Sequence, residues 1–252
     1  MLSSDRARKI RLKVERAKKH ILDLDQRIRA FCDSNPYTIA AKPHPLAAIA
    51  HTTLYVATVD PVPEDLALII GDAIHNLRSS LDHLAWQLVE AGGGVPNKST
   101  YFPICQSSHQ YVSAMGSGDL ARIPPGAEHA LFVIQPYVTG IDTLSILHEL
   151  DIFDKHRLLI TAISTLDRWG VDLARSRTLW FDKNRFIALT PNHDIVNIPT
   201  STYERQRHED FKLGVDIAFS EPKIVEGIMV VSLLSKIADF VDGVVTDFEP
   251  FL

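Results

Sequence analysis

The chain has 252 residues, of which 46% are hydrophobic and 23% are charged, the composition of an ordinary globular protein with its own core. Two cysteines are too few for a disulfide framework, and no apolar run approaches the roughly 18 residues that a membrane-spanning helix needs. The charged N-terminus is unlike a signal peptide. These features predict a cytoplasmic protein that forms a single domain over residues 1–252 and has no membrane partner.

The charge is distributed unevenly along the chain. A net charge of −5 argues against non-specific binding to nucleic acid. Residues 1–30, however, hold ten Lys or Arg against four Asp or Glu, which leaves sixteen basic and twenty-seven acidic residues, a net charge of −11, in the rest. The basic segment is interpreted as a solvated helix face, with a phosphate-contacting strip or half of a dimer contact as the alternatives.

The first half of the chain predicts two helices and one strand. Apolar residues recur at helical spacing over residues 3–32, and Asn35-Pro36 ends this first helix. Residues 48–58 are rich in β-branched and aromatic residues and predict one strand. The clearest pattern predicts a long helix over residues 61–91, with Asp60 as its N-cap and glycines 92–94 as its left-handed stop.

The second half predicts two more helices and a sheet. Residues 92–137 are rich in Gly, Ser and Pro and predict irregular loops. Helices are predicted over residues 142–165 and 224–248, and short β-rich runs separated by turn residues occupy 176–220. The predicted fold is mainly α: a four-helix bundle formed by residues 3–32, 61–91, 142–165 and 224–248. A small antiparallel β-sheet insertion at residues 176–220 makes the fold class α+β.

The polar face of the 61–91 helix carries side chains suited to recognition. At 100° per residue this face gathers His75, Asn76, Arg78, Ser79, Asp82, His83 and Trp86. A merely solvated face is usually built from Glu and Lys, which are easily hydrated and good helix formers. Two interpretations follow. The face is either a substrate site, or a buried network or dimer seam in a non-catalytic interaction protein.

Arg78 and His83 form an R-x4-H motif on this face, and through it the sequence resembles the HEPN superfamily of small helical bundles. The resemblance implies a metal-independent ribonuclease or RNA-binding module that pairs as a homodimer and has RNA as its partner. It also implies that Arg78 holds the scissile phosphate and that His83 acts as acid or base. The supporting residues in this hypothesis are His75, Asn76, Ser79 and Asp82.

Four further segments together resemble a group of uncharacterised bacterial and phage proteins. They are GDAIHNLRSSLDHLAW, YFPI, IQPY and LDIFDKHRLL. This second resemblance implies no activity.

A second set of titratable residues lies on the predicted 142–165 helix: His148, Asp151, Lys155 and His156. With carboxylate and imidazole groups on the facing helix they could hold a metal ion, as in a metal-dependent hydrolase or oxidase. The Glu-x-x-His pairs of di-iron bundles are missing, and Asp151 stands at ion-pair spacing from Lys155. The sequence therefore favours an ion-pair network here, with no metal and no cofactor expected.

Overall fold

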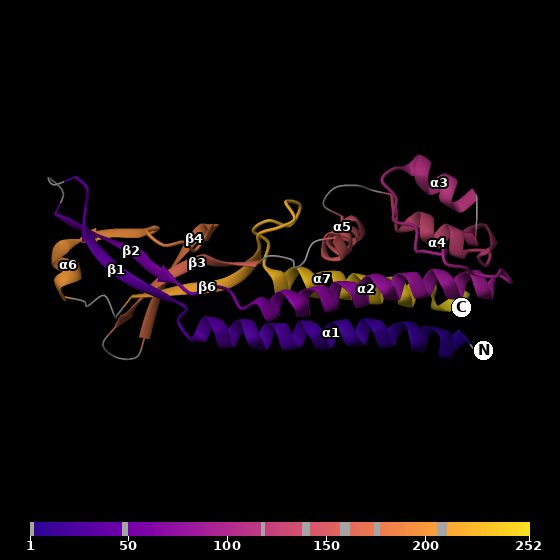
Figure 1. Cartoon of the computed structure of the whole chain (residues 1–252), viewed down its shortest axis with the longest axis horizontal. Helices are drawn as coiled ribbons and strands as arrows, with labels where there is room; N and C mark the ends of the chain where they lie inside the picture. The colour runs from indigo at the N-terminus through magenta and orange to yellow at the C-terminus, as the bar shows by residue number, and fades with distance from the viewer. Residues whose placement is uncertain are drawn as a thin grey trace.

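The computed structural model describes residues 3–46, 50–116, 119–137, 142–156, 162–173, 177–205 and 211–252. Long helices form one half of the molecule and β-strands the other, and both ends of the chain lie at the helical end (Figure 1). The chain enters the β half twice, once between the first two long helices and once before the last helix. None of the described helices is long and apolar enough to cross a membrane.

Three helices run side by side: α1 (Ser3–Asp33), α2 (Glu64–Ala91) and α7 (Val230–Phe248) (Figure 1). Each turns one apolar stripe inward, so that residues such as Ile10, Leu77 and Val241 are fully buried together. The fourth predicted helix, α5 (Thr143–His156), packs on α2 and α7 but is seen nearly end-on. The mainly helical prediction is confirmed, whereas α5 crosses the other three helices rather than extending a bundle of four aligned ones.

Several predicted helix boundaries differ from the structure. Helix α2 begins at Glu64, and not after Asp60, because Pro63 has an extended backbone with a ψ of 130°. Only Gly93 of the glycines 92–94 has a left-handed φ, of 79°. Helix α7 begins at Val230 rather than 224, because Phe219 and Ile228 pair through their backbones just before it. The predicted 142–165 helix ends at His156; residues 157–161 lie outside the described chain, and residues 162–165 are strand.

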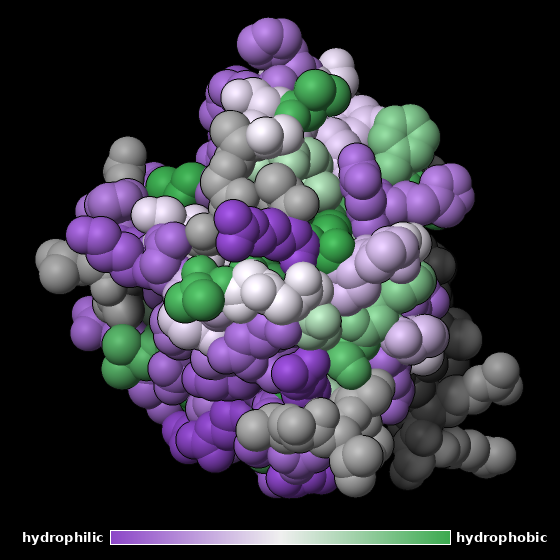
Figure 2. Space-filling model, turned by 90° about the vertical axis from the view of Figure 1, so that its right-hand side faces the viewer, coloured by the Kyte–Doolittle hydropathy of each residue, from purple (hydrophilic) through white to green (hydrophobic). Residues whose placement is uncertain are grey.

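Residues 92–137, predicted as loops, contain short helices. These are α3 (Ser108–Gly116), the 3₁₀ turn η1 (Asp119–Arg122) and α4 (Ala127–Val133). Their buried residues Tyr111, Leu120 and Leu131 join the core formed by the long helices. Figure 2 views this end of the molecule and shows apolar side chains exposed among polar ones, in keeping with the 54% and 67% exposure of Phe132 and Val112.

The β half consists of two three-stranded antiparallel sheets. One has the order β1 (Tyr37–Pro43), β2 (His51–Val59), β5 (Asp194–Pro199), and the other has the order β4 (Arg177–Ala188), β3 (Ala162–Leu173), β6 (Phe211–Phe219). The helix α6 (Thr200–Arg205) follows β5, and the 3₁₀ turn η3 (Glu249–Phe251) follows α7. The predicted antiparallel sheet is confirmed in coarse form, but β1 and β3 lie outside the predicted β region, and the predicted 48–58 strand is β2.

The two sheets pack on each other and on the helices. Val56 of β2 and Leu213 of β6 share a small apolar cluster, and the Tyr37 hydroxyl accepts a hydrogen bond from the Leu213 amide at 2.9 Å. Strand β6 then continues into the helical core, where Ile217 and Phe219 are fully buried. This continuity fixes the β half against α1 and leaves the middle of α2 to be covered by α5 and by residues 97–104.

Candidate functional site

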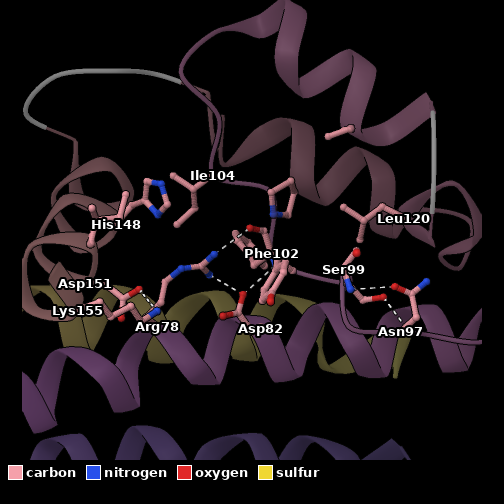
Figure 3. A pocket seen from close by; sticks show the side chains of 15 residues that line it. Arg78, Asp82, Asn97, Ser99, Phe102, Ile104, Leu120, His148, Asp151 and Lys155 are labelled. Carbon is pink, nitrogen blue, oxygen red and sulfur yellow. Dashed lines mark hydrogen bonds and ion pairs between the residues drawn. The ribbon is translucent and has the colours of Figure 1, made fainter.

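A cavity of about 690 Å³ lies over the middle of α2 (Figure 3). Arg78 and Asp82 of α2 form its floor, α5 forms one wall, and residues 97–104 pass over it. Its volume is in the range of small-molecule sites in proteins. This cavity brings together five of the site residues that the sequence predicts: Arg78, Asp82, His148, Asp151 and Lys155.

Arg78 is the buried cation of this cavity, with only 7% of its surface exposed. Its Nη1 lies 2.7 Å from Asp82 Oδ1 as an ion pair at i,i+4 spacing, and its Nη2 donates to the Phe102 carbonyl at 3.3 Å. Asp82 Oδ1 in turn accepts the Phe102 amide at 3.0 Å. The two α2 side chains therefore hold both backbone polar groups of Phe102, whose ring is 2% exposed and packs in the core.

One hydrogen-bond donor of the Arg78 guanidinium has no well-aligned acceptor. Nη1 of Arg78 is buried and has no aligned hydrogen bond to any described residue, although the Asp82 carboxylate lies beside it. The 2.7 Å ion pair with Asp82 compensates the burial of this donor in part, and a ligand or water could add the aligned hydrogen bond. The guanidinium also favours planar oxyanions such as carboxylate and phosphate. The floor of the cavity is therefore suited to an anion.

Residues 97–104 are held in place at both ends of the cavity. The Asn97 carbonyl accepts the Thr100 amide at 2.9 Å, and the Asn97 side chain accepts the Ser99 amide at 2.8 Å, which forms a compact turn. At the other end the Cys105 amide donates to the Pro136 carbonyl at 2.7 Å. Tyr101 stays 57% exposed beside the opening.

Helix α5 supplies an ion pair and an imidazole. Lys155 Nζ lies 2.5 Å from Asp151 Oδ2, with the Lys155 side chain 52% exposed and that of Asp151 only 6% exposed. This pair confirms the predicted i,i+4 interaction. One turn earlier His148 lines the cavity, and its Nδ1 is buried without a hydrogen-bond partner among the described residues.

The acid–base groups of the cavity have shifted pKa values. Burial lowers the pKa of His148, and the nearby Arg78 guanidinium lowers it further, so the neutral imidazole is favoured. Burial raises the pKa of Asp82, against the opposing effects of Arg78 and the Phe102 amide. A neutral imidazole beside a fixed cation can accept a proton from a bound hydroxyl. Titratable groups with shifted pKa values in a cavity are a common feature of functional sites.

The remaining predicted residues lie elsewhere. His83 and Asn76 line a separate groove between α2 and α1. His75 is exposed, with its Nε2 3.4 Å from Ser79 Oγ, and His156 is exposed near the end of α5. Five helical residues amount to about 140° of rotation, which is why Arg78 and His83 face different neighbours despite sharing a motif.

The described residues offer no ligand set for a metal ion. No group of three or more His, Cys, Asp or Glu side chains among them is placed to hold one. The predicted metal alternative needed several of His75, Asp82, His83, His148, Asp151 and His156 to converge. His75, His83 and His156 instead lie outside the cavity.

No protein-family model matches the chain, and neither curated proteins nor solved structures yield a match. The functional argument therefore depends on the geometry of the cavity and of the helices around it.

Sequence reasoning missed two parts of the site. The first is the backbone of Phe102, which contacts Arg78 and Asp82 although the apolar run YFPI carries no polar side chain except Tyr101. The second is Gly71, where an added Cβ would lie 2.5 Å from Asp154 Oδ1. That glycine allows α5 to approach α2 closely and so sets the distance between the floor and the wall of the cavity. A glycine inside a strong helical pattern was the available signal for this contact.

Proposed function

We propose that the protein is a HEPN-like, metal-independent ribonuclease whose site is the cavity over α2. In this proposal Arg78 binds the scissile phosphate, and the imidazole that transfers protons is His148. The observation that supports it is the placement of His148: its Nδ1 is buried without a hydrogen-bond partner among the described residues, and it lines the same cavity as the Arg78 guanidinium, whose Nη1 is ion-paired with Asp82.

The proposed chemistry uses only groups that this chain and RNA supply. The 2′-hydroxyl gives its proton to neutral His148, and the 2′-oxygen then attacks the phosphorus. The bond from phosphorus to the 5′-oxygen breaks, and protonated His148 returns its proton to that oxygen, which leaves a 2′,3′-cyclic phosphate, a free 5′-hydroxyl and a neutral imidazole. Arg78 and Lys155 would neutralise the charge that gathers on the phosphate oxygens. The exposed ring of Tyr101 offers a surface on which a base can stack.

His83 has a different role in this proposal from the one that the resemblance implies. It faces α1 within its own chain, so it could meet Arg78 only in a homodimer that brings the His83 of one copy to the cavity of another. Homodimer formation and RNA binding both belong to the proposal. An RNA substrate agrees with the cytoplasmic location expected from the sequence.

A non-catalytic alternative is favoured by one observation. Arg78 and Asp82 hold the carbonyl and the amide of Phe102, so the same residues fasten residues 97–104 onto α2. In that case the polar face of α2 is structural and the protein acts as a binding or interaction module. The two functions differ in what happens when His148 is changed, because the described hydrogen bonds that fasten Phe102 come from Arg78 and Asp82 and not from His148.

The test is cleavage of a mixed RNA pool that includes tRNA, with and without EDTA, by wild type and by His148→Ala, His83→Ala and His156→Ala. His156 is the matched control because it is an exposed histidine on the same helix, outside the cavity. We expect His148→Ala to lose cleavage by at least about 100-fold, the usual contribution of a general base. We expect His156→Ala to match wild type. Arg78→Lys should also lose most activity, because lysine lacks the bidentate fork.

Four results would overturn this assignment. Equal cleavage by His148→Ala and wild type would remove the imidazole from the mechanism. Loss in His83→Ala with no loss in His148→Ala would restore the role implied by the resemblance. Cleavage abolished by EDTA would favour the metal-dependent alternative, and no cleavage by wild type would leave the interaction module as the better account.

A further inference from the structure

A groove of about 640 Å³ runs between α1 and α2, on the other flank of α2 from the cavity. Its polar lining consists of Lys9, Lys13, Arg16, Asn76, His83 and Gln87. No carboxylate is among the described residues that line it. In a chain with a net charge of −5, a groove lined by three cations, one imidazole and two amides is an unusual concentration of hydrogen-bond donors.

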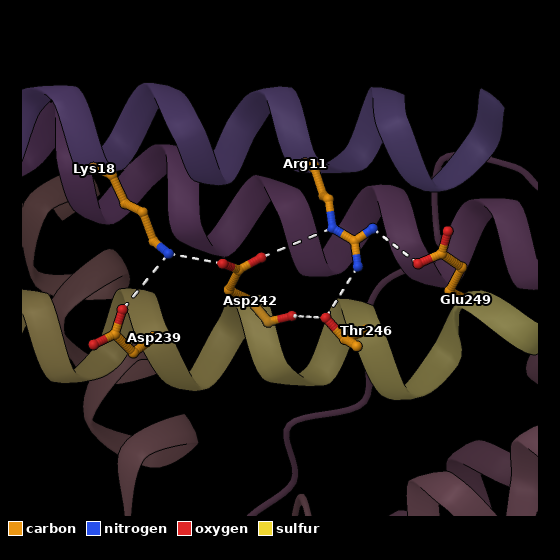
Figure 4. A network of polar contacts seen from close by, with 6 residues as sticks. All are labelled: Arg11, Lys18, Asp239, Asp242, Thr246 and Glu249. Carbon is orange, nitrogen blue, oxygen red and sulfur yellow. Dashed lines mark hydrogen bonds and ion pairs between the residues drawn. The ribbon is translucent and has the colours of Figure 1, made fainter. Parts of the chain in front are cut away.

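The cations of α1 fall into two groups. On the side that faces α7, Arg11 reaches Glu249 at 2.9 Å and Lys18 reaches Asp242 at 2.7 Å (Figure 4). On the groove side, no carboxylate of the described chain lies within ion-pair distance of Lys13 or Arg16. The charges of Lys13 and Arg16 therefore have no ion-pair partner among the described residues, while the cations facing α7 are paired.

The spacing of the groove cations argues against a purely structural role. Lys9, Lys13 and Arg16 stand at i, i+4 and i+7, so they share one face over about 10 Å of helix. Like charges at this spacing destabilise an isolated helix, and only Lys9 is relieved, by Asp5 at 3.2 Å. A row of mutually repelling cations is stabilised when a polyanion binds along it.

We infer that this groove binds the sugar–phosphate backbone of single-stranded RNA, as a contact separate from the cavity. The cations would meet phosphate oxygens, while the amides of Asn76 and Gln87 and the imidazole of His83 can donate to phosphate or ribose oxygens. Leu12, which is 51% exposed on the groove rim, offers an apolar surface to a ribose or base. The choice of RNA over another polyanion rests on the proposed function, but binding in the groove does not require that the cavity cleaves RNA.

The test is binding of a fluorescein-labelled 12-nucleotide 2′-O-methyl RNA, measured by anisotropy in EDTA at several salt concentrations. The 2′-O-methyl groups remove the attacking hydroxyl, so the outcome is independent of whether the cavity cleaves RNA. The variant is Lys13→Gln with Arg16→Gln, because glutamine keeps helix propensity. The matched control is Lys19→Gln, an exposed lysine of α1 outside the groove. Thermal unfolding of each variant checks that it is folded.

With three phosphate contacts, wild type should show a slope of log affinity against log salt of about −2, and the double variant about −0.7. The double variant should bind on the order of tenfold more weakly at about 0.1 M salt. Lys19→Gln should bind like wild type. Binding by the double variant within twofold of wild type, or absence of salt-dependent binding by wild type, would overturn the inference. Competition by polyglutamate as strong as that by RNA would overturn it in favour of an acidic polypeptide.

Discussion

Arg78 and His83 lie five residues apart on α2, yet they face opposite flanks of that helix. The Arg78 guanidinium is 2.7 Å from Asp82 and donates to the Phe102 carbonyl, under residues 97–104. His83 instead lines the groove beside Lys13 of α1. A motif that looks like one site in the sequence is thus divided between a cavity with mixed charge and a groove with positive charge.

The Arg78–Asp82 pair should contribute strongly to stability. Arg78→Ala removes the partner of a carboxylate whose side chain is only 27% exposed, and it releases the Phe102 carbonyl. We expect the free energy of unfolding to fall by about 2–4 kcal/mol in urea titrations, somewhat less than for a fully buried pair. Arg16→Ala, at an exposed arginine with no ion pair among the described residues, should change it by less than about 0.5 kcal/mol. Equal effects of the two substitutions would contradict this account.

Gly71 should be required for the close approach of α5 to α2. In Gly71→Ala the new Cβ would lie 2.5 Å from Asp154 Oδ1, so α5 or the carboxylate must shift. We expect a loss of about 1 kcal/mol, in which overpacking outweighs the helix propensity gained from alanine. In an Asp154→Ala background the same substitution should stabilise by about 0.5–1 kcal/mol, because only the propensity gain remains. A cycle of urea titrations measures both values, and a substitution that costs the same in both backgrounds would refute the contact.

The long helices could be predicted from the sequence because their apolar stripes have a regular 3.6-residue period. Both α1 and α2 differ from their predicted bounds by only a few residues. Strand β1 could not be predicted in the same way: only the first three residues of its sequence YTIAAKP favour a strand, and its Ala-Ala-Lys-Pro half depends on pairing with β2. Strand β3 was assigned partly to a helix, because a short run rich in Leu and Ile fits either structure.

Within the site, the sequence predicted which residues of one helix lie side by side better than which residues of different segments meet. The i,i+4 spacing indicated that Arg78 and Asp82 share a face, and Asp151 and Lys155 form the expected pair. It could not indicate that residues 97–104 would cover Arg78 while α1 would border His83. Those neighbours are set by the packing of distant segments, which the helical period does not encode.

Asp154 should make stability depend on pH. Burial raises its pKa above the ordinary value of 3.8, and the neighbouring Asp151 carboxylate raises it further. The native state therefore binds this proton more tightly than the unfolded state does, so its contribution to stability falls as pH rises from 3.8 through the raised pKa. Asp154→Asn should raise the urea midpoint at pH 7 and have a diminishing effect toward pH 4. A variant that is less stable than wild type at pH 7 would contradict the sign of this shift.

The stability that the contact between α1 and α7 provides should depend on salt concentration, chiefly because of the Asp242 carboxylate. Asp242 lies 2.7 Å from Lys18 Nζ and 3.9 Å from Arg11 Nε, whereas Asp239, with its side chain 79% exposed, reaches only Lys18 at 3.6 Å (Figure 4). Asp242→Asn should therefore lower the free energy of unfolding by about 1 kcal/mol at low salt, and Asp239→Asn by only a few tenths. The difference should shrink in 1 M NaCl, where the screening length is about 3 Å. Urea titrations at 20 mM and 1 M NaCl measure this. Equal losses for the two variants, or a loss for Asp242→Asn that does not change with salt, would mean that packing rather than charge holds α7 to α1.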